Sequence, residues 1–193
     1  MKPVILLLIL MLLVPPGTGS RAQRYVEIRE IARWGHGNWQ VRKVENTHFQ
    51  MRNCEIWTGG DGIGTLRLTV GDGGADASLT YQPVVFRGMP LPMTDQDDFL
   101  MLFDGKPNWI AAEVTISEWV DDWEMFRVDA SLSNEGVAEA VQNLRDANTL
   151  LVGTQGRGKP HVIDTFLLDG FTATWLKAGE WCGFDPEKRF RTL

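Results

Sequence analysis

Residues 65–81 have the sequence TLRLTVGDGGADASLTY, in which apolar and polar side chains alternate on both sides of a glycine-rich centre. Alternation with a period of two is typical of a β-strand that buries one of its faces. The central GDGG, residues 71–74, is suited to a tight reversal between two such strands. This stretch therefore predicts a β-hairpin with one apolar face.

The same alternation recurs along much of the chain, around Trp39, Val114 and Val128. Clusters of glycine and aspartate separate the alternating segments, as turns do. No internal repeat and no linker divides residues 23–193, which we expect to form a single domain. The predicted fold class is mainly β, an antiparallel β-sandwich with one or two short helices.

Two stretches depart from this alternation. Apolar side chains recur at helical spacing from Val137 until about Ala147, after Ser133 or Asn134 as the residue that caps the first turn. This pattern predicts an amphipathic helix. A second, shorter helix is predicted over residues 170–177, after an apolar strand.

The N-terminus predicts export. Lys2 precedes an apolar run over residues 4–14, which Pro15 ends, and small residues lie near Ala22. The run is shorter than the roughly 20 apolar residues that a membrane-spanning helix needs, whereas it suits a signal peptide. We therefore expect residues 1–22 to be a signal peptide that is cleaved near Ala22. The mature chain would be periplasmic or secreted, with no transmembrane segment.

The charge of the chain bears on its partners. Its formal net charge is -6 at pH 7, and removal of the signal peptide would take away two basic residues, Lys2 and Arg21. A negatively charged protein with no basic cluster repels the phosphates of nucleic acid. We therefore expect no nucleic-acid partner.

The chain has two cysteines, Cys54 and Cys182. In an oxidising compartment two distant cysteines favour one disulfide, with two buried free thiols as the alternative. On the chain-entropy model, closing so long a loop stabilises the fold by about 4–5 kcal/mol. We expect this disulfide to stabilise the fold rather than to carry out redox chemistry.

Motifs for catalysis, metals and cofactors are missing. Gly153, Gly158 and Lys159 have the spacing of a phosphate-binding loop, but Pro160 replaces the required Ser or Thr and a strand follows instead of a helix. No serine lies in a Gly-x-Ser-x-Gly elbow, and the histidines and cysteines show no metal-binding spacing. The sequence predicts no catalytic residue, no metal ligand and no cofactor.

Acidic clusters leave open a hydrolase whose carboxylates meet only in the folded chain. Hydrolysis of glycosides needs two carboxyl groups about 5–9 Å apart across a cleft, a separation that sequence spacing cannot test. The candidate residues are Asp95, Asp97, Asp98, Asp121, Asp122 and Glu124.

The chain has eight tryptophans. Trp119 and Trp123 flank Asp121, Asp122 and Glu124, and exposed aromatic rings beside carboxylates can stack on sugar rings. This segment is a candidate ligand platform. Core packing is the alternative, because an enclosed Trp buries about 150–250 Å².

The C-terminal part carries a resemblance. A strand, a helix and a strand over residues 125–152 precede TFLLDGFTA, residues 165–173, and Trp39-Gln40-Val41 lies near the mature start. This order and the Leu-x-Gly-Phe-x-Ala turn resemble the invasion-associated locus B family of exported bacterial proteins. The resemblance implies an immunoglobulin-like β-sandwich in the periplasm or at the cell surface. It also implies no known active site and a link to host-cell interaction or envelope stress.

The function that we expect is therefore binding without catalysis, in the bacterial periplasm or envelope, with a protein or another envelope component as partner. The alternatives are the secreted hydrolase and a carbohydrate-binding module that uses Trp119 and Trp123.

Overall fold

The computed structural model describes residues 28–108, 114–133, 135–155 and 160–187. The predicted signal peptide and its cleavage point near Ala22 lie outside these ranges. Among the residues described, no helix is long and apolar enough to cross a membrane.

The strands form two antiparallel sheets, which we call the large sheet and the small sheet. The large sheet has the order β1-β2-β3-β4-β5-β9-β8, and the small sheet has the order β11-β10-β6-β7. The strands of the large sheet are β1 (Ile28–His36), β2 (Trp39–Asn46), β3 (Met51–Gly59), β4 (Thr65–Gly71), β5 (Ser78–Gln82), β8 (Val114–Val120) and β9 (Phe126–Ser133). Those of the small sheet are β6 (Asp98–Phe103), β7 (Lys106–Asn108), β10 (Thr149–Gln155) and β11 (His161–Leu167).

The hairpin predicted for residues 65–81 is confirmed. β4 and β5 pair antiparallel, with Leu68 opposite Leu79 and Leu66 opposite Tyr81, and these four side chains are buried. The reversal contains the short 3-10 turn η1 (Asp72–Gly74), in which glycines 73 and 74 adopt positive φ angles that disfavour other residues.

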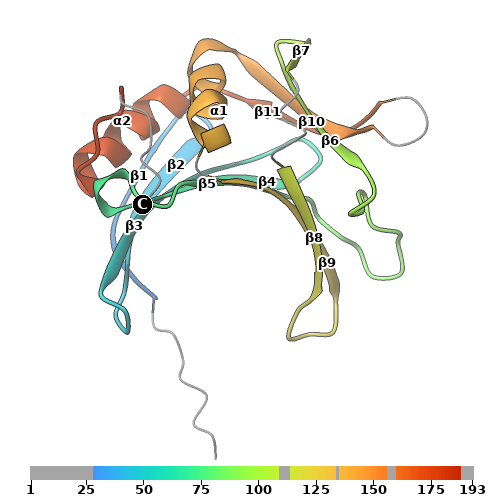
Figure 1. Ribbon diagram of the computed structural model, residues 1–193, viewed down its shortest axis with the longest axis horizontal. Coiled ribbons are helices and arrows are strands. Elements are labelled where there is room, and N and C mark those ends of the chain that lie inside the picture. The colour runs from blue at the N-terminus through green and yellow to red at the C-terminus, as the bar shows by residue number, and fades with distance from the viewer. Residues whose placement is uncertain (1–27, 109–113, 134, 156–159, 188–193) are drawn as a thin grey trace, which may run out of the picture.

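The fold class is confirmed as an antiparallel β-sandwich with two helices. The large sheet is arched, and the small sheet and both helices lie on its convex side (Figure 1). Between the layers, aromatic contacts include the ring of Tyr81, whose centroid lies 5.8 Å from that of Phe99 and 5.9 Å from that of Phe166. None of the described helices or strands covers the other side of the large sheet over its central strands.

Both predicted helices are present, and the second is longer than expected. α1 (Glu135–Asp146) agrees with the prediction, whereas α2 (Phe171–Cys182) continues well past residue 177. The extension follows from burial, because Ala178 and Cys182 continue the buried face of the helix. The helix ends at Gly183, which has a φ of 67° and donates its amide hydrogen to the carbonyl of Gly179 at 2.9 Å.

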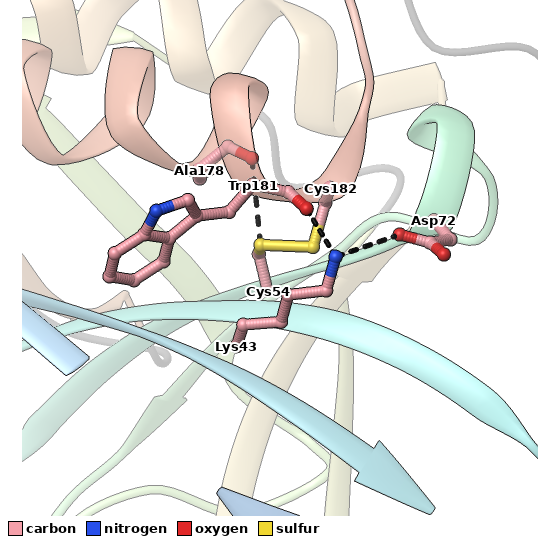
Figure 2. Close-up of a disulfide and its surroundings, with 6 residues drawn as sticks. All are labelled: Lys43, Cys54, Asp72, Ala178, Trp181 and Cys182. Carbon is pink, nitrogen blue, oxygen red and sulfur yellow. Dashed lines mark hydrogen bonds and ion pairs between the residues drawn. A yellow bond between two sulfur atoms is a disulfide. The ribbon is translucent and has the colours of Figure 1, made fainter. Parts of the chain in front are cut away.

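Cys54 and Cys182 form a disulfide between β3 and the last turn of α2 (Figure 2). Their Cα atoms lie 6.1 Å apart and both residues are buried. Beside the disulfide, the ammonium group of Lys43 donates a hydrogen bond to the carbonyl of Trp181 and lies 3.7 Å from a carboxylate oxygen of Asp72 (Figure 2). A positive charge at the carboxyl end of a helix is favourable, so Lys43 supports the same junction.

Among the tryptophans in the described part of the chain, Trp39 and Trp175 are buried in the core. The indole N–H of Trp39 donates to the carbonyl of Leu167 at 3.0 Å, and that of Trp175 donates to the carbonyl of Pro186 at 3.1 Å. Each buried ring therefore has a partner for its polar atom.

Candidate functional site

The open side of the large sheet carries a hollow of about 260 Å³. The side chains around it alternate along β4, β5 and β9 with those that enter the core, so they point to the concave side of the arch in Figure 1. We call this surface the concave face. The residues that line the hollow are Thr65, Arg67, Thr69, Thr80, Gln82, Asp129 and Ser131.

Hydrogen bonds fix part of this lining. The hydroxyl groups of Thr80 on β5 and Ser131 on β9 lie 3.1 Å apart. Ser131 also donates to Oδ2 of Asp129 at 3.0 Å.

Arg67 is exposed and forms no ion pair with any residue in the described part of the chain. Its guanidinium group is therefore free to bind a ligand.

Trp119 stands next to the hollow. Its indole N–H donates to Oδ1 of Asp129 at 3.0 Å, and 43% of its surface is exposed. Asp129 thus holds the aromatic ring on one side and the Ser131 hydroxyl on the other, while each carboxylate oxygen keeps a further acceptor position.

Trp57 on β3 lies opposite Arg67 in the register of the sheet. Two guanidinium groups lie over its ring, with Cζ of Arg33 5.2 Å and Cζ of Arg42 5.5 Å from the ring centroid. Arg42 is neutralised by Glu55, at 2.7 Å. This end of the concave face is therefore covered by arginine side chains, unlike the end at Trp119.

The predicted platform at residues 119–124 is split by the structure. Trp119 lies at the hollow, whereas Trp123 lies in the β8–β9 turn, 80% exposed, and their rings make no contact with each other. Asp121 closes the turn: its Oδ1 accepts from the amides of Trp123 and Met125 at 3.0 and 2.9 Å. Phe126 has the same place in the alternation as the buried Val128, but it is 64% exposed because it follows this turn at the end of the sheet.

The remaining acidic candidates serve as turn residues or lie on the surface. Oδ2 of Asp97 accepts from the amide and hydroxyl of Thr94 at 2.8 and 3.0 Å, which closes a turn before β6. Asp122 and Glu124 are exposed in the β8–β9 turn, and Asp95 and Asp98 are also exposed. In the described ranges no group of three or more His, Cys, Asp or Glu residues could hold a metal ion.

Sequence reasoning missed a carboxyl pair, Asp61 and Asp164. Asp164 is buried on β11 and accepts hydrogen bonds from the amides of Gly62, Gly64 and Thr165 at 2.7, 2.8 and 3.0 Å. Burial raises the pKa of Asp164. Burial acts in the same direction on the pKa of Asp61, but the hydrogen bond from the Thr165 amide and the bond shared with Asp164 lower it below the ordinary value.

The glycine spacing of residues 60–64 was the signal for this pair. A side chain at Gly60, Gly62 or Gly64 would collide with Asp164, since a Cβ atom at these positions would lie between 1.9 and 3.1 Å from the nearest atom of its carboxylate group. Glycines at this spacing are typical of a turn, which is consistent with their place between β3 and β4, but the spacing alone does not indicate a carboxylate among them. The pair is packed into the turn and joins the two sheets.

A larger hollow of about 600 Å³ opens at the start of α2. Its walls come mainly from turns at residues 36–38, 147–148 and 167–170 and include none of the predicted site residues. The concave hollow is the stronger candidate because its side chains lie on paired strands, which hold a binding site more accurately than turns do.

The phosphate-loop interpretation gains no support. β11 follows the loop as a strand, as predicted, and Gly158 and Lys159 lie outside the described residues.

No family model, curated protein or solved structure matches this chain. The resemblance to the invasion-associated locus B family therefore stays a prediction.

Proposed function

We propose that this protein is exported and acts in the bacterial envelope by binding, without catalysis, through the concave face of the large sheet. The observation that carries the proposal is the hollow on this face, which is lined by hydrogen-bonding side chains from three neighbouring strands. Polar groups that converge on a concave surface are the usual mark of a binding site.

The lining favours binding over hydrolysis. A glycoside hydrolase uses two carboxyl groups across its cleft. Here a single described carboxylate, that of Asp129, lines the hollow, and both of its oxygens accept hydrogen bonds from neighbouring side chains.

The proposed export rests on the signal peptide expected over residues 1–22, and the proposed location in the envelope rests on the same expectation.

The test is co-sedimentation of the chain from residue 23 onward with envelope fractions of the source bacterium. Arg67→Glu reverses the free charge on the concave face, and Lys106→Glu makes the same change on β7 of the other sheet, where Lys106 is also exposed. We expect Arg67→Glu to lower retention about tenfold or more, because a hydrogen bond to a charged group contributes roughly 1.5–3 kcal/mol. Lys106→Glu should bind like the unchanged protein.

Two outcomes would overturn the proposal. If the unchanged chain is not retained by any envelope fraction above a control protein, the binding function is wrong. If it is retained but Arg67→Glu is retained equally well, the concave face is not the binding surface.

A further inference from the structure

We infer that the ligand of the concave face is a neutral, hydroxyl-rich glycan chain that lies across the strands, with one sugar ring against Trp119. The inference rests on the binding function proposed above and names its ligand class.

The lining has the hydrogen-bonding capacity that such a ligand needs. A Thr or Ser hydroxyl can both donate and accept, and the amide of Gln82 offers both kinds of group. Sugar hydroxyls also donate and accept, so each finds a complementary partner. Among the side chains that line the hollow none is aliphatic, whereas a protein partner would need apolar anchors in the centre of its contact. The residues of mixed capacity are Thr65, Thr69, Thr80, Gln82 and Ser131.

The charge of the face favours a neutral ligand. Arg67 and Asp129 bring one positive and one negative charge to the hollow. At the Trp57 end, Arg33 lies 2.6 Å from Glu30 in an ion pair, and Arg42 is paired with Glu55. A polyanion would meet a balanced surface on a chain whose net charge is -6, so its attraction to Arg67 is offset by Asp129 and by the charge of the whole chain.

Trp119 supplies the flat apolar surface that the C–H groups of a sugar ring need. The hydrogen bond from its indole N–H to Asp129 fixes the ring beside the hollow before any ligand arrives. A fixed ring loses little side-chain entropy on binding. Trp123 is more exposed but lies in the turn, away from the polar lining.

The register of the strands sets the length of the site. Beyond the arginine-covered Trp57, one row of outward side chains runs from Arg67 to Thr80, Ser131 and Thr115, each opposite the next on neighbouring strands from β4 to β8. With strands about 4.8 Å apart, this row is about 14 Å long. Several linked sugars are needed to follow it, so we expect an oligosaccharide to bind more tightly than a single sugar.

The experiment titrates the chain from residue 23 onward with neutral tetrasaccharides of β-1,4-linked glucose, β-1,3-linked glucose, α-1,4-linked glucose and β-1,4-linked N-acetylglucosamine, and with the matching monosaccharides. Isothermal calorimetry measures affinity. Trp119→Ala is compared with Trp123→Ala, a matched control in the same hairpin, and Thr80→Ala tests the polar lining with a change that removes only a small side chain. Thermal unfolding of each variant confirms that it is folded.

We expect at least one tetrasaccharide to bind more tightly than its monosaccharide. Trp119→Ala should weaken that binding about tenfold, the effect of about 1.4 kcal/mol, Thr80→Ala should weaken it measurably, and Trp123→Ala should leave it unchanged. Binding that is lost equally in Trp123→Ala would overturn the inference.

A failure of the glycan inference can be told apart from a failure of the proposed function. If no tetrasaccharide binds while Arg67→Glu still lowers retention by the envelope, the ligand is not a neutral glycan and the concave face still binds a partner. If Trp119→Ala leaves glycan binding unchanged and Arg67→Glu leaves retention by the envelope unchanged, both proposals are wrong.

Discussion

The carboxylate of Asp164 accepts a hydrogen bond at 2.7 Å from the amide of Gly62, 102 residues earlier in the chain. A second bond at 2.8 Å comes from the amide of Gly64. These bonds connect the turn between β3 and β4 in the large sheet to β11 in the small sheet. One buried side chain therefore satisfies backbone amides that would otherwise lack a partner, and it holds the two sheets together at this edge.

Replacement of this carboxylate should destabilise the fold. In Asp164→Asn an NH2 group takes the place of one acceptor oxygen, so a glycine amide faces another donor. We expect the free energy of unfolding to fall by about 2–3 kcal/mol, measured by urea denaturation. The control is Asp122→Asn, an exposed residue of the β8–β9 turn, which should change stability by no more than about 0.5 kcal/mol. Equal stability of the two variants would contradict the role of Asp164.

Neighbouring glycines of the same turn should respond differently to one added methyl group. A Cβ atom at Gly60 would lie 1.9 Å from Oδ1 of Asp164, whereas one at Gly59 would meet only the carbonyl of Gly64 at 3.9 Å. We expect Gly60→Ala to lower the unfolding free energy by roughly 1–3 kcal/mol, as overpacking does. Gly59→Ala should be close to neutral. Thermal melts of the two variants, which carry the same chemical change, decide whether contact with Asp164 is the cause.

Local patterns in the sequence were sufficient to predict those strands that bury only one of their faces. The hairpin of β4 and β5 has a clean alternation and a glycine-rich turn, and both features lie within residues 65–81. β6 was not predicted, because FLMLF, residues 99–103, is a continuous apolar run with no alternation. Phe99, Leu100 and Met101 are all buried, and such a strand looks the same as a piece of buried helix.

The concave face could not be predicted from local patterns. Arg67, Thr80 and Ser131 are ordinary polar positions on three separate strands. They meet because β9 pairs with β5 across 43 intervening residues of the chain, from residue 83 to residue 125. Asp61 and Asp164 are brought together by an even longer connection. Trp119 was a candidate ligand residue with core packing as the alternative, and its side chain is exposed. The residue that holds its ring, Asp129, lies on β9 rather than beside it in the sequence.

The phenol of Tyr81 should stay protonated in the folded chain at high pH. Burial raises the pKa of Tyr81, and the negative charge of Asp164, whose Oδ2 lies 3.4 Å from the phenol oxygen, raises it further. An unfolded tyrosine ionises near pH 10. The folded state therefore keeps its full stability below about pH 10 and loses it as the pH rises further, because only the unfolded state releases the proton.

Tyrosinate absorbance measures this directly, because the chain has only two tyrosines, Tyr25 and Tyr81. In Tyr25→Phe no tyrosinate signal should appear until the protein unfolds, as monitored in parallel by circular dichroism. The same variant in denaturant should titrate near pH 10. A native titration of Tyr25→Phe near pH 10 would show that Tyr81 is accessible to solvent.

Reduction of the disulfide between Cys54 and Cys182 should lower stability without loss of the fold. The disulfide spans 128 residues, so its removal frees a long loop in the unfolded chain and costs at most about 4–5 kcal/mol. For a domain of this size the thermal midpoint should fall by at most roughly 8–20 °C, while the strand signal in circular dichroism at 20 °C is kept. The matched control is the double variant Cys54→Ala/Cys182→Ala, which should melt at the lower temperature with or without reductant. If reductant left the midpoint of the unchanged protein where it was, the contacts of α2 with β2 and β3, rather than the disulfide, would account for the stability of this junction.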